Sequence, residues 1–199
     1  MTRVLRRCQF ILLTTLLLLA GCHQQASPPA PRDPPHAGRN GGAPAQVVSA
    51  QALRVQDGDS FIARLQDGSR MTVRLSGIDA PEQSQPHADQ SRQNLQRLLQ
   101  GRDLRIHIAK KDQYGRAVAQ VFAQADAQDS DVGLAQIERG LAWFYHQHRR
   151  DLPTEWREVY AKAEQAARRA GVGLWQAPPA QPPWEFRSSR RAQADSSDR

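Results

Sequence analysis

The chain has 199 residues, a formal net charge of +7, and 13 Gly and 13 Pro. This length allows one domain of ordinary size with flanking segments, and it excludes an enzyme built from two large cores. The flanks carry +5 of the net charge and residues 46–175 carry only +2. Overall charge therefore does not by itself identify a nucleic-acid-binding protein.

The first 22 residues have the pattern of an export signal. Arginines precede an apolar run over residues 10–20, and Gly21 and Cys22 follow it. A helix of that length reaches only about 16 Å, which is too short to span a bilayer. We interpret residues 1–21 as a signal peptide. Its end, Leu19-Ala20-Gly21-Cys22, resembles the bacterial lipobox. An exported lipoprotein facing the periplasm or cell exterior, anchored to a membrane through lipidated Cys22, is favoured over an ordinary signal peptide that ends near a cysteine.

Both segments that flank the middle of the chain are polar and rich in Pro. Residues 22–45 combine Pro, Ala, Gly and Gln, which predicts a disordered tether. Residues 178–199 predict a flexible polar tail, in which Trp184 and Phe186 are able to pack back on the domain before the chain frays near Arg187. The folded domain is therefore expected over residues 46–177.

Alternating apolar residues predict strands in the first half of this domain. The alternating sets are Phe61, Ala63 and Leu65; Met71, Val73 and Leu75; Leu104, Ile106 and Ile108; and Val118 with Phe122. Asp67-Gly68-Ser69 joins the first two sets and suits a tight hairpin, because glycine tolerates a positive φ.

Three segments predict helices. Residues 88–100 place leucines on one face and stop at Gly101, and a shorter helix is expected over residues 131–139. The last helix is expected to begin with Thr154 as its cap and to end at Gly171. About five strands with three helices in some 130 residues predict a mainly β, α+β fold, a small Greek-key barrel with helices on one side.

Acidic residues cluster near two arginines in the strand region. Arg74, Asp79 and Glu82 are expected around one end of the barrel, and Asp59 opens the neighbouring strand. Two carboxylates and a backbone carbonyl form an incomplete oxygen cage, which suits Ca²⁺ with water in its remaining positions. A hard cation, a nearby Glu and two arginines, the second being Arg116, are the parts that phosphodiester hydrolysis needs. Taken singly, the acids are explained as turn residues and Arg74 as the solvent-facing residue of a strand.

Four blocks of the sequence resemble the thermonuclease (staphylococcal-nuclease-like) family in order and spacing. They are Val55-Gln56-Asp57-Gly58-Asp59-Ser60, Val73 to Glu82 (VRLSGIDAPE), Asp112-Gln113-Tyr114-Gly115-Arg116 and Gly140-Leu141-Ala142-Trp143. The resemblance covers about residues 48–175. It implies a five-stranded OB-fold barrel that hydrolyses DNA and RNA with Ca²⁺, with little base preference, and leaves 3′-phosphate ends.

The resemblance also implies roles for individual residues. Asp59, Asp79 and the carbonyl of Ala80 would bind Ca²⁺, Glu82 would be the base for the attacking water, and Arg74 and Arg116 would hold the phosphate. Tyr114 resembles the residue that seats the nucleotide. Ser60 and Ala80 stand where the family usually has Thr. A Thr hydroxyl can hold a water near the metal and Ala80 cannot, which is expected to weaken Ca²⁺ binding.

No catalytic or metal-binding role is assigned to the histidines or to the aromatic residues. His107, His146 and His148 are expected at solvent-facing or rim positions, and the aromatic run 143–145 in the core. With no protein partner evident, the chain is expected to act as a monomer. The alternative function is a catalytically weak or silent OB-fold lipoprotein of the cell envelope that only binds nucleic acid.

Overall fold

The computed structural model describes residues 46–124, 129–177 and 179–197. The predicted signal peptide, the tether and Cys22 lie outside these residues. Within the described ranges, no helix combines the length and the hydropathy that a membrane span requires.

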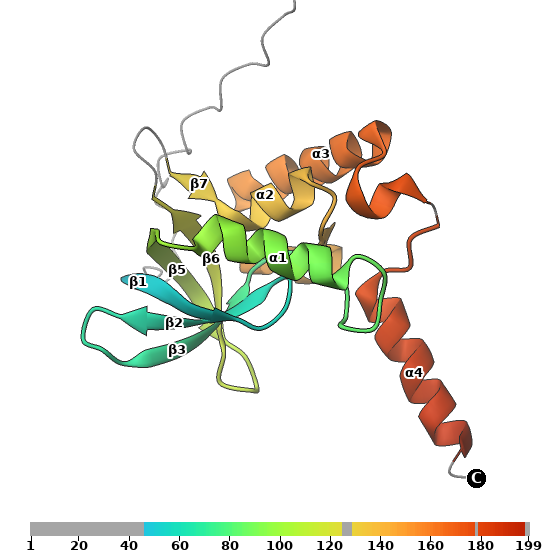
Figure 1. Cartoon of the computed structure of the whole chain (residues 1–199), viewed down its shortest axis with the longest axis horizontal. Coiled ribbons are helices and arrows are strands. Elements are labelled where there is room, and N and C mark those ends of the chain that lie inside the picture. The colour runs from blue at the N-terminus through green and yellow to red at the C-terminus, as the bar shows by residue number, and fades with distance from the viewer. Residues whose placement is uncertain (1–45, 125–128, 178, 198–199) are drawn as a thin grey trace, which may run out of the picture. The chain divides into compact units, whose positions relative to one another are not determined.

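Five strands form a closed barrel, as the sequence predicts. They are β1 (Gln46–Val55), β2 (Ser60–Leu65), β3 (Arg70–Leu75), β5 (Asp103–Lys111) and β6 (Ala117–Ala123). Their order is β3-β2-β1-β5-β6, and a parallel pairing of β3 with β6 closes the ring (Figure 1). All other barrel pairings are antiparallel, which is the arrangement of the OB fold.

The predicted hairpin between β2 and β3 is confirmed. Phe61 pairs with Val73 and Ala63 pairs with Met71, so the alternating residues of both strands share one face. Gly68 has a φ of +82°, a conformation that costs a glycine no steric energy. The Asp67 carboxylate accepts a hydrogen bond from the Ser69 amide at 2.9 Å and thereby fixes the turn.

The core lies inside the barrel and beneath the helices. Phe61, Val73 and Ile106 have no exposed surface, and Leu104 is 1% exposed. Strand β6 is buried along its whole length because both of its faces are covered. This rigid centre holds the barrel ends, where the polar residues lie.

The three predicted helices are present with small differences at their ends. They are α1 (Ala88–Leu99), α2 (Val132–Glu138) and α3 (Thr154–Ala170), and Figure 1 shows α1 crossing the strands while α2 lies beside α3. The prediction that Thr154 caps α3 is wrong. Pro153 occupies the cap position and no side chain caps the helix, because Thr154 is already its first helical residue.

Several short elements complete the domain. They are β4 (Ile78–Asp79), β7 (Ser130–Asp131), β8 (Trp143–Phe144) and the 3₁₀ helices η1 (His146–Asp151) and η2 (Gly173–Gln176). Beyond them, helix α4 (Pro183–Ser197) occupies most of the segment expected to be a flexible tail. The expectation that Trp184 packs back on the domain is confirmed, since its ring lies 5.1 Å from that of Tyr145 in a parallel stack.

Candidate active site

The seven residues predicted for the site line one open cleft at an end of the barrel. The cleft has a volume of about 1160 Å³, and the predicted residues that line it are Asp59, Arg74, Asp79, Ala80, Glu82, Tyr114 and Arg116. These side chains come from the β1–β2 turn, from β3, from the segment around β4 and from the β5–β6 turn. The barrel therefore brings together residues that are up to 57 positions apart, as in Asp59 and Arg116.

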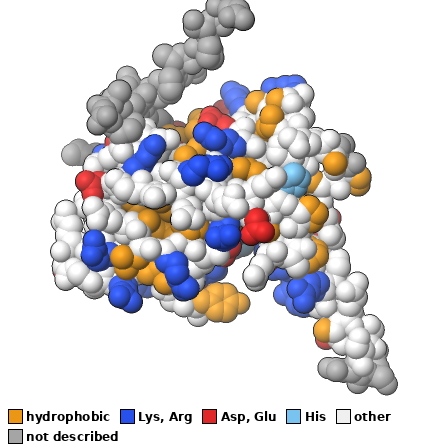
Figure 2. Space-filling view, viewed as in Figure 1, with side chains coloured by type: hydrophobic (Ala, Val, Ile, Leu, Met, Phe, Trp, Pro, Cys, Tyr) orange, Lys and Arg blue, Asp and Glu red, His pale blue; other side chains and the backbone are white. Residues whose placement is uncertain are grey.

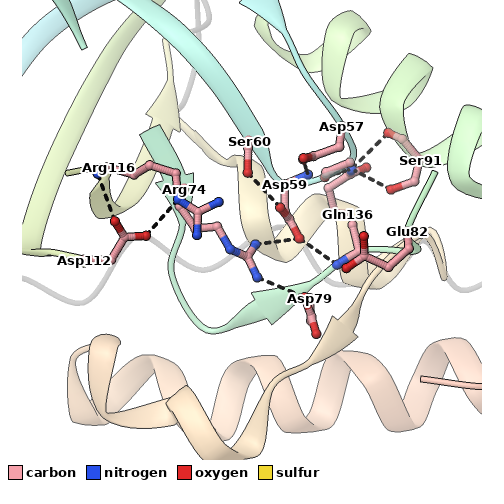
Figure 3. A network of polar contacts seen from close by, with 12 residues as sticks. Asp57, Asp59, Ser60, Arg74, Asp79, Glu82, Ser91, Asp112, Arg116 and Gln136 are labelled. Atoms are coloured by element: carbon pink, nitrogen blue, oxygen red, sulfur yellow. Dashed lines mark hydrogen bonds and ion pairs between the residues drawn. The ribbon is translucent and has the colours of Figure 1, made fainter. Parts of the chain in front are cut away.

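Arg74 links the two buried carboxylates at the centre of the cleft (Figure 3). Its Nη1 lies 2.5 Å from Oδ2 of Asp59, and its Nη2 donates to Oδ1 of Asp79 at 2.9 Å. Arg74 opposes Ser60 in the β2–β3 ladder, which places it beside the start of β2. Its side chain is only 15% exposed, so the interpretation as a solvent-facing strand residue is wrong.

The electrostatics of this centre follow from burial and from contact between opposite charges. Burial opposes the ionisation of Asp59, but the Arg74 guanidinium and the Ala80 N–H, which donates at 2.7 Å, lower the pKa of that carboxyl overall. Burial also acts against the charge of Arg74, yet Asp59 and Asp79 raise the pKa of its guanidinium. At neutral pH the pair Asp59 and Arg74 is therefore ionised.

Asp57 is a further member of the cluster that the sequence marked only as an acidic turn residue. Its Oδ1 accepts a hydrogen bond from the backbone N–H of Asp59 at 3.0 Å. Burial, together with the negative charge of Asp59, raises the pKa of Asp57 to about 7. Asp57 therefore shapes the turn that presents Asp59, and it gains a proton near neutral pH.

A buried polar network holds this turn against the helices. The Gln136 side chain on α2 donates to the carbonyl of Gly58 at 2.6 Å and to the carbonyl of Ser91 on α1 at 3.1 Å. A Cβ on Gly58 would lie 1.9 Å from Oγ of Ser91, so only glycine fits there. This support was not predictable from the sequence, because glutamine and serine carry no periodic signal.

Arg116 lies in the β5–β6 turn, and among the described residues part of its guanidinium has no partner. Its Nε donates to Oδ2 of Asp112 at 2.7 Å, and its side chain is 31% exposed. Among the described residues, no partner accepts a hydrogen bond from its two terminal nitrogens. Tyr114 is 74% exposed beside it, with its ring 5.5 Å from the guanidinium carbon. This turn thus presents two terminal guanidinium nitrogens, unpaired among the described residues, and an exposed aromatic ring to the cleft.

Glu82 carries a partner that the sequence did not predict. Its Oε1 accepts a hydrogen bond at 2.6 Å from Nη1 of Arg187 on α4, and Nη2 of Arg187 donates to Oδ2 of Asp79 at 2.8 Å. The one available signal was Trp184, whose expected packing on the domain would carry the following turn of the chain to the cleft. Three guanidinium groups, not two, therefore face the acidic cluster.

The donor chemistry of the cleft fits a hard divalent cation. Asp59 and Asp79 offer carboxylate oxygens that converge on one guanidinium, which shows that both are directed at a common positive charge. In the described part of the chain, no three His, Cys, Asp or Glu side chains are grouped closely enough to hold a metal. A bound ion would thus depend on two carboxylates, a backbone carbonyl and water, as in weak oxygen sites.

The histidines lie mostly where the sequence predicts. His146 and His148 are exposed in η1, and His148 reaches the rim of the cleft. His107 differs, because it is half-buried and packs edge to face on Phe122 at 5.2 Å. Burial lowers its pKa, so this histidine is a neutral packing residue.

Comparison with known proteins agrees with this arrangement. The family model described as "Staphylococcal nuclease homologue" matches residues 72–177, a range that begins after Asp59. An "Uncharacterized endonuclease" of Haemophilus influenzae is 30% identical over 127 residues, which are 64% of this chain and 66% of that protein. A "Micrococcal nuclease" of Shigella flexneri is 32% identical over 146 residues, which are 71% of this chain and 81% of that protein.

A plant relative has a similar sequence identity to this chain, but the match covers a smaller share of the plant protein. The "Staphylococcal-like nuclease CAN1" of Arabidopsis thaliana is 31% identical over 122 residues, which are 61% of this chain and 35% of the plant protein. This chain thus spans from about a third to two thirds of the length of several curated relatives. The matched region contains the parallel closure of the barrel, both site arginines, Asp79 and Glu82. Together with the barrel topology, these matches establish that the chain belongs to the staphylococcal nuclease homologue family.

Proposed function

We propose that this protein is a Ca²⁺-dependent nuclease that hydrolyses DNA and RNA with little base specificity and leaves 3′-phosphate ends. The observation that carries the proposal is the convergence of Asp59, Arg74 and Asp79 in the cleft that also contains Glu82 and Arg116. The names of the nuclease relatives support the same reaction class.

The chain's own residues supply most of the chemistry. Ca²⁺ held by Asp59, Asp79 and the Ala80 carbonyl would supply positive charge to a phosphate oxygen. Glu82 takes a proton from the attacking water, whose oxygen bonds to phosphorus while the bond from phosphorus to the 5′ oxygen breaks. The leaving 5′ oxygen gains a proton from solvent, and the phosphate stays on the 3′ side.

The arginines stabilise the negative charge that builds on the phosphoryl oxygens. The terminal nitrogens of Arg116 have no partner among the described residues and would donate two parallel hydrogen bonds to a phosphate, while Arg74 adds fixed charge from the buried side. These contacts address phosphate oxygens, which every nucleotide carries. The exposed Tyr114 ring offers a stacking face that accepts any base, which agrees with low base specificity.

Cleavage of denatured DNA by the purified full-length protein tests the proposal. We expect cutting with millimolar Ca²⁺, none with a chelator, and a loss of about 10²-fold or more in Glu82→Gln. The products should not prime a DNA polymerase until a phosphatase has removed their 3′ phosphates. If Glu82→Gln cuts as fast as the unchanged protein, the proposed role of Glu82 is wrong. If neither cuts but the protein binds DNA, the alternative of a silent binding module is correct.

We further propose that the protein is exported and anchored through lipidated Cys22. The basic residues, the short apolar run and the small residues before Cys22 support this assignment. In a bacterial host fed labelled palmitate, we expect label on the unchanged protein and none on Cys22→Ser. The variant should also leave the membrane fraction, and a Cys22→Ser protein that stays membrane-bound would contradict the anchor.

A further inference from the structure

The start of helix α4 is fixed to the domain beside the cleft. Trp184 stacks on Tyr145 with a ring separation of 5.1 Å and an angle of 2° between the planes. The side chain of Gln85 donates to the carbonyl of Gln181 at 2.9 Å, just before the helix. From residue 188 onward the described part of α4 is exposed. The helix is therefore anchored near its start and exposed from residue 188 onward.

The docked start of α4 places the guanidinium of Arg187 in the acidic cluster. Arg187 follows Trp184 by three residues, so both lie on the same face of α4. Its two terminal nitrogens contact Asp79 at 2.8 Å and Glu82 at 2.6 Å. The other oxygen of Asp79 accepts from Arg74 at 2.9 Å. Both oxygens of Asp79, and one of Glu82, are thus occupied by guanidinium groups of this chain.

Arg187 and a metal ion would require the same carboxylates. Asp79 is a ligand in the proposed function, and Glu82 must be free to accept a proton from water. A guanidinium in contact with Asp79 also repels a divalent ion at that carboxylate, since like charges at short range raise each other's energy.

We propose that α4 is an intramolecular inhibitor of the active site, in which Arg187 occupies Asp79 and Glu82 and is displaced when Ca²⁺ binds. The inference rests on the proposed function. It assigns Arg187 a role opposite to that of Arg116, whose terminal nitrogens are free among the described residues to receive a phosphate. The terminal nitrogens of Arg187 instead donate hydrogen bonds to carboxylates.

The contacts of Arg187 with Asp79 and Glu82 can break without undocking the helix. The Arg187 side chain is 36% exposed, so water is at hand to solvate the guanidinium when it leaves. The aromatic stack of Trp184 lies one turn earlier and does not depend on Arg187. The side chain can therefore swing out by rotamer changes while the helix stays docked. Binding of Ca²⁺ and the position of Arg187 are then coupled, and the protein responds only when the ion is abundant enough to compete.

Calorimetric titration of Ca²⁺ into the full-length protein and into Arg187→Gln tests this coupling. We expect Arg187→Gln to bind Ca²⁺ about tenfold more tightly and to reach half-maximal cleavage at a correspondingly lower Ca²⁺ concentration. Arg190→Gln is the matched control, because it removes the same charge one turn later from an exposed position. Its Ca²⁺ affinity should equal that of the unchanged protein. Trp184→Ala, which removes the anchor of α4, should shift the affinity in the same direction as Arg187→Gln.

The outcomes separate this inference from the proposed function. Equal or weaker Ca²⁺ binding by Arg187→Gln, with normal cleavage by the unchanged protein, would overturn the inhibitor and leave the nuclease intact. Tighter Ca²⁺ binding by Arg187→Gln, without cleavage by either protein, would support competition between Arg187 and Ca²⁺ but overturn the nuclease, and with it the inhibitory role of that competition. Absence of Ca²⁺ binding in both proteins would overturn both. A fall in cleavage at saturating Ca²⁺ would identify Arg187 as a substrate-binding residue instead.

Discussion

Arg74 illustrates how much one side chain contributes to this site. It neutralises two carboxylates that burial would otherwise destabilise, and it reaches both because the guanidinium is a planar fork. A lysine ammonium is a point charge on a flexible stem and cannot hold two carboxylates in the same geometry. The position therefore requires arginine for its shape as well as for its charge.

We expect Arg74→Lys to lower kcat by about 10²- to 10³-fold, because an electrostatic donor of the transition state is misplaced. Steady-state cleavage of denatured DNA at saturating Ca²⁺ measures this loss. Arg64→Lys is the control, since Arg64 lies on the neighbouring strand at an exposed position and its side chain donates a hydrogen bond only to Gln51 among the described residues. A loss of less than threefold in Arg74→Lys would show that Arg74 has no direct part in turnover.

Single residues also mark the limit of prediction from sequence. Asp59, Asp79 and Arg74 were identifiable because they stand in compact motifs whose spacing is set by local turns. Arg187 was not, because its contact with Asp79 spans 108 positions and exists only after Trp184 has docked on Tyr145. Apart from Trp184 one turn earlier, nothing in the residues around Arg187 distinguishes it from Arg190 or Arg191 on the same helix.

At the scale of elements, Asp131 joins three parts of the fold at one buried carboxylate. Its oxygens accept hydrogen bonds from the Leu134 amide at the start of α2, from Gln120 on β6 and from the Tyr160 hydroxyl on α3. Burial raises the pKa of Asp131, and these three donors act against that rise. The same burial, with the charge of Asp131, raises the pKa of Tyr160 well above its usual range.

We expect Asp131→Ala to lower the free energy of unfolding by about 2–4 kcal/mol, because it removes a helix cap and leaves buried donors without partners. Urea unfolding followed by tryptophan fluorescence measures the change. Asp103→Ala, which loses one exposed hydrogen bond from Gln51, should cost about 0.5 kcal/mol or less. Equal losses in the two variants would contradict the structural role of Asp131.

Elements with strong local signals were predictable, and elements fixed by tertiary contacts were not. The β2–β3 hairpin follows from Asp67-Gly68, and α3 ends as predicted at Gly171, which adopts a φ of +60°. The strands β4 and β8 have two residues each, too few for a periodic pattern, and they exist because they pair with each other. Helix α4 was hidden by its polar composition, since mainly its first turns contact the domain.

At the scale of the whole molecule, the barrel was predictable because most of its strands alternate or are almost continuously apolar. The closing pair was not visible in the sequence, because β3 and β6 are parallel and lie far apart along the chain. The cleft forms at the end where this closure occurs, which is why residues from so many segments line it. The family resemblance supplied the connection that periodicity alone did not.

The closure of β3 on β6 has a consequence for how the protein folds. Arg74 pairs with Val118, two residues after Arg116, so the two arginines become neighbours only when this contact forms. Pairing of such distant segments carries a large loop entropy and tends to occur late in folding. A chain whose local hairpins and helices have already formed would still lack an assembled phosphate site. Under the proposed function, we therefore expect a partly folded chain to be unable to cut nucleic acid before the barrel has closed.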